Sequence, residues 1–596
     1  PAGAAKLGQK LCCKKAGGQV PEYPRQELPD ATKWDQTKWS PNYRNDNRIE
    51  THESGTAPCK TACPAHVAVQ GYLKLAAQGR YDEALALIKR ENPLPAICGR
   101  VCNRRCEDAC TRGRVDEAVA IDEVKKFIAQ RDLDAATRYV PPVVTPTRAG
   151  GFDQKIAIIG AGPAGLSCAF YLAEKGYKPV VFEKNERPGG MLTYGIPSFK
   201  LQKDVIEAEV EVIRLMGAEF RYGVEVGRDV TLDELRAQGF KAFYVAIGCQ
   251  GGRLAGIPGE DAEDVTVAVD FLREVNSGKI DALPGRTIVV GGGNVAIDVA
   301  RNACRLGSEH VEMFCLESEV KMPASEEERR EAIEDGAHIS CGWGPKEIHL
   351  DEAGRVCGIT FKRCTRVFDD EGRFAPEYDE NDLRRVDADR VVMSIGQSIV
   401  WGDLLAGSKV ELGRSQGALA DPQTYQTAEP DIFVGGDVYT GPSFAIDAIA
   451  AGHEAAVSIH RFVQPGSTLT IGRNQRRYTA LDRDDVVIES YDNASREVAR
   501  VDREREKAAP FSEYVETFTE EQVRAETARC LGCGASIVDP NKCIGCGLCT
   551  TKCAFDAIHL DRDRPECSTM VKYEQKLPSL GKYALKRAIK IKFGKK

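Results

Sequence analysis

Two short glycine-rich sequences, GAGPAG at 160–165 and GGGNVA at 291–296, limit the possible folds of this chain more than any other feature. Each follows a run of apolar residues typical of a buried strand, and each precedes a helical pattern and a second strand-like run. Strands that alternate with helices predict parallel, doubly wound sheets. We therefore expect an α/β protein with two Rossmann-like nucleotide-binding domains.

The first glycine sequence has the full context of a dinucleotide site. Gly160 allows a tight turn, Gly162 lets the backbone approach a pyrophosphate, and Gly165 permits close packing of the helix on the strand. The N-terminus of that helix adds partial positive charge. Glu183 ends the next strand, where its carboxylate would accept a hydrogen bond from a ribose hydroxyl.

Cysteines gather near both ends of the chain. Of 22 cysteines, six lie within 59–110 and seven within 530–567, at spacings that suit metal ligands better than disulfides. Cys543, Cys546, Cys549 and Cys553 have the C-x2-C-x2-C-x3-C spacing of bacterial ferredoxins. A zinc site is the alternative, although zinc ribbons use two separated CxxC pairs.

Charge and hydropathy exclude several classes of partner. The net charge of −8 is spread along the chain, and no apolar run approaches the roughly 18 residues that span a bilayer. We expect a cytoplasmic protein with no nucleic-acid partner and no membrane insertion. The strongly basic tail after Val571 is interpreted as a solvated or subunit-docking end in preference to a membrane-binding one.

The pattern of elements divides the chain into segments. Apolar residues recur at helical spacing over 67–88 and 121–133, so the first 140 residues are predicted to be helical. The predicted segments are an arm (1–55), a helical iron–sulfur domain (56–150), an FAD-binding domain (151–282 and 387–470), an NAD(H)-binding domain (283–386), a linker (471–527), a ferredoxin-like module (528–570) and a basic tail (571–596).

The chain resembles the glutamate synthase small-subunit family and its relatives, which include the flavin half of dihydropyrimidine dehydrogenase and the large subunit of ferredoxin-dependent transhydrogenases. The resemblance covers roughly 55–460 and rests on GAGPAG with Glu183, ERPGGMLTYGIPSFKL at 186–201, VAIG at 245–248, SIG at 394–396 and VGGD at 434–437. It implies that the second nucleotide domain is inserted into the first.

The resemblance also implies which residues bind the cofactors. FAD would contact the first glycine turn and Asp437, with the helix after Asp437 directed at the flavin. A nicotinamide nucleotide would contact the second turn. The cofactor-binding residues expected are Gly160, Gly162, Pro163, Ala164, Gly165, Glu183, Lys184, Gly190, Met191, Gly248, Gly291, Gly293, Asn294, Val295, Glu317, Gly396, Gly436, Asp437, Ser443 and Ala445.

Glu317 favours NAD(H) over NADP(H). Relatives that use NADP(H) tend to place an aromatic residue and two arginines where this chain has Cys315, Leu316 and Glu317. A carboxylate there accepts from free ribose hydroxyls and repels a 2′-phosphate. In the alternative, Glu317 points to solvent and Arg329 or Arg330 contacts the phosphate.

By the resemblance, the N-terminal cysteines hold two interlocked [4Fe-4S] clusters. One would take Cys59 and Cys110, and the other Cys63, Cys102 and Cys106. The second cluster's fourth ligand in relatives is Gln or Glu, but the aligned residue here is Lys125, which cannot ligate while protonated. Either Glu123 or Asp122 substitutes for it, or the site holds another species. The first cluster lacks two ligands, because relatives carry a CxxC shortly before Cys59 and this chain does not.

The C-terminal cysteines offer the missing pair. The sequence ARCLGCG at 528–534 is similar to the stretch that precedes that pair in relatives. We expect Cys530 and Cys533 to complete the cluster of Cys59 and Cys110, leaving Cys543, Cys546 and Cys549 to hold another with Cys553 or Cys567. In the competing interpretation, Cys530, Cys533 and Cys553 form a degenerate local ferredoxin cluster. Either way, three or four clusters are expected.

The remaining mid-chain cysteines show no CxxC or CxxxxC pair that would pass flavin electrons to a disulfide, so they are interpreted as small buried apolar residues (Cys168, Cys249, Cys304, Cys315, Cys341, Cys357 and Cys364). Electrons would leave the flavin through the clusters.

The sequence thus predicts an NADH-linked FAD and iron–sulfur oxidoreductase subunit. We expect hydride transfer to depend on the placement of the nicotinamide and flavin rings, with no catalytic side chain. Its partner would be another flavoprotein, a hydrogenase or a ferredoxin, with electron bifurcation as one version of the function. The alternatives are a glutamate synthase small subunit and a non-enzymatic electron-wiring scaffold.

Overall fold

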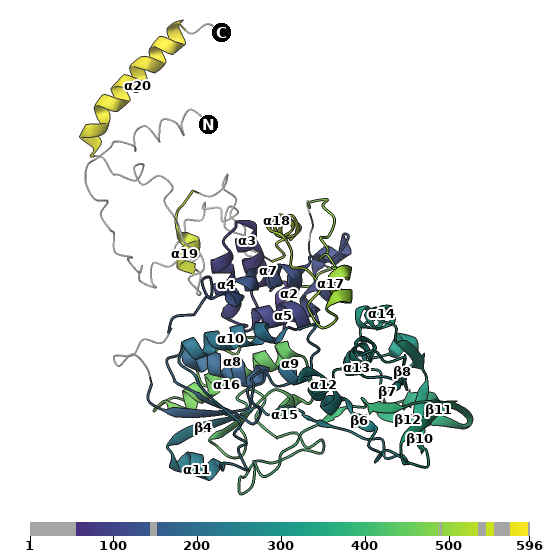
Figure 1. Ribbon diagram of the computed structural model, residues 1–596. Coiled ribbons are helices and arrows are strands. Elements are labelled where there is room, and N and C mark those ends of the chain that lie inside the picture. Colours follow the sequence, from purple (N-terminus) through teal and green to yellow (C-terminus); the bar gives the residue numbers. More distant parts are fainter. Residues whose placement is uncertain are drawn as a thin grey trace. The chain divides into compact units, whose positions relative to one another are not determined.

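The computed structural model describes residues 55–143, 152–484, 486, 488, 491–534, 544–552 and 572–593. Residues 54–535 form one compact unit, while 1–53 and 536–596 form another. In the first unit, the helices near the N-terminus, the first parallel sheet and a returning C-terminal segment share one core, while the second parallel sheet has cores of its own (Figure 1). None of the helices in the described ranges combines the length and the apolar character needed to cross a membrane.

The N-terminal domain is helical, as its periodicity predicts. The expected helix over 121–133 is α7 (Ile121–Leu133), whereas the pattern over 67–88 divides at Gly79, whose φ of +73° ends one helix and starts the next. The other elements are α2 (Pro58–Ala62), α3 (Val69–Ala77), α4 (Tyr81–Lys89), α5 (Pro95–Val101), α6 (Arg105–Asp108) and a 3-10 turn (Thr111–Arg114).

The first parallel sheet has the strand order β15-β4-β1-β2-β3. Its strands are β1 (Lys155–Ile159), β2 (Val180–Glu183), β3 (Glu219–Tyr222), β4 (Phe240–Val245) and β15 (Ile432–Val434). Ile156 and Ile158 face α8 (Pro163–Glu174) and α16 (Ala445–Val463), in a core that continues into the N-terminal helices. The other helices are α9 (Met191–Tyr194), α10 (Lys203–Leu215), α11 (Leu232–Ala237) and α15 (Asp437–Thr440). The helical domain is therefore fused to this sheet by shared apolar packing.

The second parallel sheet has the order β6-β13-β7-β8-β9. It contains β6 (Val265–Val267), β7 (Arg286–Val290), β8 (His310–Cys315), β9 (His338–Cys341) and β13 (Arg390–Met393), with α12 (Ala268–Asn276), α13 (Asn294–Arg305), a 3-10 turn (Glu319–Lys321) and α14 (Glu326–Glu334). An antiparallel sheet follows, of β10 (Trp343–Leu350), β11 (Val356–Phe368) and β12 (Phe374–Val386), and β5 (Gly251–Gly252) pairs with β14 (Gln397–Ser398). Because β6 and β13 pair into this sheet, the domain extends beyond 283–386 on both sides.

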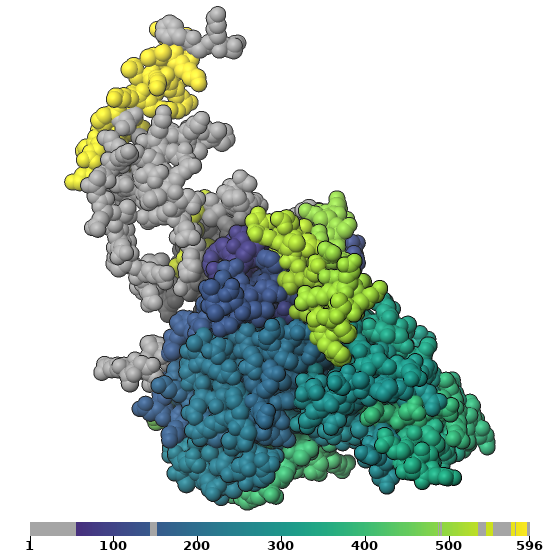
Figure 2. Space-filling view, in the orientation of Figure 1, coloured from purple at the N-terminus to yellow at the C-terminus, as the bar shows by residue number. Residues whose placement is uncertain are grey.

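The segment expected to be a linker, 471–527, packs on both domains. We call residues 491–534 the return segment; it contains α17 (Arg503–Ala508) and α18 (Glu520–Ala528). In Figure 2 it forms a yellow-green band over the purple helical domain that reaches the teal second domain. Glu513 pairs with Arg100 and Lys126 of the helical domain. Ion pairs, which leave no hydrophobic periodicity, hold it in place together with buried Phe518 and Val523, which join the core of the N-terminal helices.

The same segment is fixed to the second domain through α13. Arg301 donates to the Tyr514 hydroxyl at 2.6 Å, and Arg305 pairs with Glu506 at 2.7 Å. Both α13 arginines also pair with Asp335. The return segment thus ties the second nucleotide domain to the N-terminal domain.

A buried carboxylate should control how firmly the return segment is docked. Glu526 is fully buried, accepts from the Ala120 and Glu497 backbone amides at 2.7 Å each, and pairs with buried Arg529 at 2.6 Å. Replacing Glu526 with alanine is expected to lower the free energy of unfolding by about 3–5 kcal/mol, because the Arg529 charge loses its buried partner. Thermal and urea denaturation measure this, and exposed Glu521→Ala on the same helix should cost less than about 0.5 kcal/mol.

In the second unit, α19 (Leu548–Lys552) and α20 (Tyr573–Phe593) are the helices among the described residues. Helix α20 is basic towards its C-terminus, with Lys590 and Lys592 in its last turn. Exposed Leu585, Ile589 and Ile591 also lie on it.

Candidate nucleotide and cluster sites

The three glycines of the first turn have different surroundings. Gly160 has φ of +103°, and a Cβ there would lie 2.5 Å from the Ala246 carbonyl oxygen. A Cβ on Gly165 would lie 2.0 Å from the Gly160 carbonyl oxygen, so the helix can pack this closely only with glycine. Nothing lies within 4 Å of a Cβ on Gly162, which caps α8. The turn therefore leaves open space directly before a helix N-terminus, which suits a pyrophosphate.

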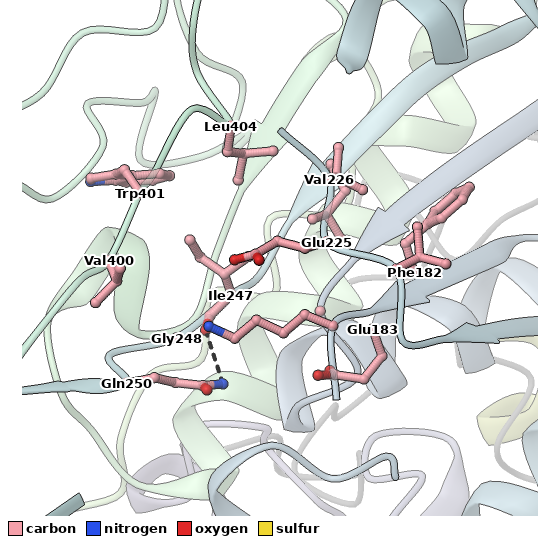
Figure 3. A pocket seen from close by; sticks show the side chains of 14 residues that line it. Phe182, Glu183, Glu225, Val226, Ile247, Gly248, Gln250, Val400, Trp401 and Leu404 are labelled. Atoms are coloured by element: carbon pink, nitrogen blue, oxygen red, sulfur yellow. Dashed lines mark hydrogen bonds between the residues drawn. The ribbon is translucent and has the colours of Figure 1, made fainter. Parts of the chain in front are cut away.

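Glu183 connects this turn to the end of β2. Its Oε2 accepts from the Ala161 amide at 2.8 Å, and its Oε1 accepts from the Asn185 amide at 2.9 Å. Oε1 also accepts from the Asn185 side-chain amide at 2.6 Å, and Glu183, 3% exposed, lines the hollow in Figure 3. This is the position from which a carboxylate binds an adenosine ribose.

The hollow has apolar walls that sequence reasoning missed. Figure 3 shows Glu183 on one side, with Trp401 and Leu404 across from it. The lining residues are Ile159, Gly160, Phe182, Glu183, Lys184, Val224, Glu225, Val226, Ile247, Gly248, Gln250, Val400, Trp401 and Leu404. Val224 and Ile247 follow the carboxyl ends of β3 and β4, a position that could have marked them. A flat apolar ring system such as adenine fits walls of this kind.

The expected FAD residues lie at the carboxyl ends of parallel strands. Gly160–Gly165 follow β1, Glu183 and Lys184 end β2, Gly248 follows β4, and Gly436 with Asp437 follow β15. Gly190 and Met191 begin α9, and a Cβ on Gly190 would lie 3.1 Å from the Gly162 Cα. The topology thus brings residues from four separate sequence motifs to one edge of the sheet.

Asp437 opens the short helix α15. Burial raises the pKa of its carboxyl to about 6. Its Oδ1 accepts from the Ser443 amide at 3.2 Å, and Ala445 begins α16 two residues later. Gly436 has φ of +65°, and a Cβ there would lie 3.0 Å from the Ala164 Cβ, so this turn packs against the start of α8. Asp437 and the N-terminus of α16 therefore stand beside the first glycine turn.

The second turn repeats this arrangement. A Cβ on Gly291 would lie 2.2 Å from the Ser394 carbonyl oxygen, whereas a Cβ on Gly293 would meet nothing within 4 Å. A Cβ on Gly292 would lie 3.1 Å from Glu317 Oε2, so the Glu317 carboxylate lies against the turn and does not point away from it. Asn294 and Val295 begin α13, and Asn294 Oδ1 accepts from the Ser325 amide. Gly396 follows β13, with φ of +119°.

The two arginines offered as alternative phosphate ligands have protein partners. Arg329 Nη1 donates to the Glu319 carbonyl oxygen at 2.6 Å. Arg330 Nε lies 3.9 Å from Glu334 on the same helix. Neither contact involves the glycine turn. The geometry therefore favours Glu317 as the group that meets the adenosine ribose.

Cys59, Cys110, Cys530 and Cys533 line one cavity. Its other walls are mainly apolar, from Pro58, Val69, Gln70, Leu73, Thr111, Arg112, Val119, Ile121 and Leu531. Burial raises the pKa of the Cys59 thiol, and its three cysteine neighbours raise it further. The N-terminal helical domain and the end of the return segment therefore meet at this cavity.

Cys63, Cys102 and Cys106 form a second group around Lys125. Burial raises the pKa of Cys102; Lys125 opposes that shift, and Asp122 and Cys63 add to it. Burial also raises the pKa of Cys106; Lys125 opposes that shift, and Asp122, Glu107 and Cys102 add to it. Buried Lys125 forms an ion pair with Asp122. Asp122 and Glu123 are the two carboxylates expected as the fourth ligand of this cluster. Asp122 is paired with Lys125, while Glu123 Oε2 is buried without a hydrogen-bond partner.

Four of the seven mid-chain cysteines are buried, as expected, and three are not. Cys168, Cys249, Cys315 and Cys364 are buried, but Cys304, Cys341 and Cys357 are half-buried. Cys315 and Cys341 lie opposite each other on β8 and β9, with their Sγ atoms 3.6 Å apart. A search for closely spaced cysteines in the sequence could not find this pair, because the pairing of β8 with β9 brings together residues that are far apart in the sequence.

The ferredoxin-like cysteines are only partly described. Cys546 is exposed and Cys549 is half-buried in α19. Cys543, Cys553 and Cys567 lie outside the described residues.

Three family models match the chain. The model for pyridine nucleotide-disulphide oxidoreductase covers residues 154–452. A model for dihydropyrimidine dehydrogenase domain II, 4Fe-4S cluster, covers 50–137, and a 4Fe-4S binding domain covers 536–559. Cys530 and Cys533 lie between these ranges.

Among known proteins, the beta subunit of an NADP(+)-dependent formate dehydrogenase from Moorella thermoacetica is 35% identical over 80% of this chain and 70% of its own length. The small chain of glutamate synthase [NADPH] from Escherichia coli K12 is 36% identical, over 69% and 89%. The NAD-dependent dihydropyrimidine dehydrogenase subunit PreT from Escherichia coli O157:H7 is 32% identical, over 68% and 91%. The chain therefore belongs to the pyridine nucleotide-disulphide oxidoreductase family, as a glutamate synthase small-subunit-like oxidoreductase with 4Fe-4S domains at both ends.

Proposed function

We propose that this chain is an NADH-linked subunit that moves electrons between a nicotinamide nucleotide, FAD and iron–sulfur clusters, towards a partner redox subunit or a ferredoxin. The observation that carries the proposal is the repeated turn: two open glycines, Gly162 and Gly293, each stand before a helix N-terminus with an acid, Glu183 or Glu317, at the turn. Electron bifurcation in a larger complex is one version of this activity.

The side chains would act by binding and orientation. FAD, when bound, supplies hydride acceptance and one-electron release. The α8 and α13 N-termini would hold pyrophosphates, and Glu183 and Glu317 would hold the riboses. Lys200 Nζ, 2.6 Å from Asp298, joins the first domain to α13 and would fix the angle between the two ring sites.

NAD(H) is preferred because of local charge. Glu317 lies against the second turn, while Arg329 contacts the Glu319 carbonyl oxygen and Arg330 lies 3.9 Å from Glu334. A 2′-phosphate would meet a carboxylate in place of a cation. Two of the three relatives named above are described by NADP(H) and one by NAD, so this choice varies within the family.

The Cys63, Cys102 and Cys106 group is proposed as the entry to the cluster chain. Arg105, next to Cys106, forms a bidentate pair with Asp447 at 2.9 and 3.1 Å. Asp447 lies in the first turn of α16, whose N-terminus stands beside Asp437, and it also accepts from Ser443. One ion pair thus connects the helix that would face the flavin to this cysteine group.

Anaerobic mixing with NADH tests the proposal. Bleaching of the flavin absorbance, followed by loss of the broad cluster absorbance, is the expected result. A bound flavin that NADH does not reduce would favour the wiring scaffold. Glutamate synthesis on addition of a glutamate synthase large subunit would favour the alternative that this chain is a glutamate synthase small subunit. The 36% identity to the Escherichia coli small chain supports testing it.

Metal content is a separate prediction. Twelve cysteines at 59–110 and 530–567 are counted as possible ligands. Cys98 is left out, because it matches a cysteine that is not a ligand in relatives. Anaerobically purified protein should carry about 12–16 irons per chain and little zinc, because each four-iron cluster takes about four ligands. Elemental analysis with acid-labile sulfide measures this, and an excess of zinc over iron would reject the cluster assignment.

A further inference from the structure

We propose that Cys59, Cys110, Cys530 and Cys533 together hold one four-iron cluster, built from the N-terminal helical domain and the return segment. The inference deepens the proposed function by assigning the ligands of one cluster. Neither 4Fe-4S family match includes Cys530 or Cys533, so the matches do not assign this site.

The four thiols reach the cavity from three structural elements. Cys59 lies in the first turn of α2, and Cys110 caps the 3-10 turn that starts at Thr111. Cys530 and Cys533 follow α18, whose C-cap is Arg529. Gly532 has φ of +65°, which lets the chain turn between the two cysteines. The cavity is closed on its other sides by apolar side chains such as Val69 and Leu73.

A buried polar network fixes Cys530 in place. Arg529, 1% exposed, pairs with Glu526 at 2.6 Å and with Asp116 at 3.0 Å, and it donates to the Glu117 carbonyl oxygen at 2.7 Å. Arg112, also 1% exposed, donates to the Arg529 carbonyl oxygen. A buried guanidinium with this many partners holds the backbone next to Cys530 in one position.

Cys533 is held independently. Gln70 Nε2, on α3, donates to the Cys533 carbonyl oxygen at 2.6 Å. Helix α18 also packs against α3 and α7. The CxxC pair is therefore fixed to the domain that carries Cys59 and Cys110, within the compact unit 54–535.

The donor set suits a cluster better than a single ion. Zinc in a four-cysteine site draws all four sulfurs to about 2.3 Å from one point. Within the described ranges, no three His, Cys, Asp or Glu side chains are close enough to share one metal ion. A four-iron cluster binds each thiolate through a different iron, so its ligands stand farther apart around an apolar cavity.

The experiment compares paired cysteine variants of the full-length protein by electron paramagnetic resonance after anaerobic reduction. Cys59→Ser/Cys110→Ser and Cys530→Ser/Cys533→Ser should lose the same signal and about four irons per chain. Cys546→Ser/Cys549→Ser, the matched control, should lose a different signal. If the first two pairs lose different signals, or if the 530/533 pair and the 546/549 pair lose the same one, the cross-chain cluster does not exist.

Wild-type protein gives a second readout that is independent of variant folding. Alkylation with iodoacetamide should leave these four cysteines unmodified in the holoprotein and label all four together after iron chelation. Labelling of Cys530 and Cys533 in the holoprotein, with Cys59 protected, would overturn the proposal. Neither measurement uses NADH, so a failure of NADH to reduce the flavin rejects the proposed function and leaves this assignment standing.

Discussion

Replacing Gly162 with alanine is expected to produce a folded protein that has lost most of its FAD. A Cβ at this position meets no atom within 4 Å, and its φ of −76° suits alanine, so the polypeptide itself accepts the change. The added methyl group would occupy the space where a pyrophosphate meets the helix N-terminus. We expect an affinity loss of about 100-fold, or ~2.7 kcal/mol, measured by FAD titration of the apoprotein.

Gly293→Ala is the matched control. This glycine also has an open Cβ position, with φ of −90°. The variant should keep its flavin but lose reduction by NADH, because the change falls on the other turn. Full FAD occupancy in Gly162→Ala, or flavin loss in Gly293→Ala, would contradict the assignment of the two turns.

Glu317→Arg is expected to shift the kcat/KM ratio from NADH towards NADPH by about 10–100-fold. The change removes a repulsion against the 2′-phosphate and adds a charge-assisted contact. Steady-state rates of flavin reduction with both nucleotides measure the shift.

The control for that variant is Glu319→Arg, which makes the same charge change two residues away at an exposed side chain. It should move the ratio by less than about twofold, because an exposed charge that does not contact the phosphate interacts with it only weakly through water. A wild-type enzyme that already prefers NADPH would show that Glu317 does not select the nucleotide.

The sequence predicts well those features that local geometry enforces. Gly160 and Gly165 are required by backbone contacts within one strand–turn–helix unit, and the acid at Glu183 follows from the length of that unit. Helix α7 was also predicted with its observed bounds, because its apolar spacing is regular.

Long-range contacts were harder to predict. Trp401 and Leu404 line the hollow beside Glu183 from a loop that has no motif. The return segment looked like a linker because ion pairs such as Arg305 with Glu506 are specified by partners some two hundred positions away. Only the displaced CxxC at Cys530 and Cys533 indicated that the chain folds back.

The contact of Cys530 and Cys533 with the N-terminal helical domain also affects biosynthesis. At roughly 5–20 residues per second, a ribosome that has made Cys59 needs on the order of a minute to reach Cys533. The N-terminal helical domain therefore leaves the ribosome with two of the four proposed cluster ligands, Cys59 and Cys110. The other two, Cys530 and Cys533, are synthesised later. A chain truncated before Cys530 could therefore fold both nucleotide domains and still lack the proposed cluster. Iron loading at that site would then report that synthesis had reached the return segment.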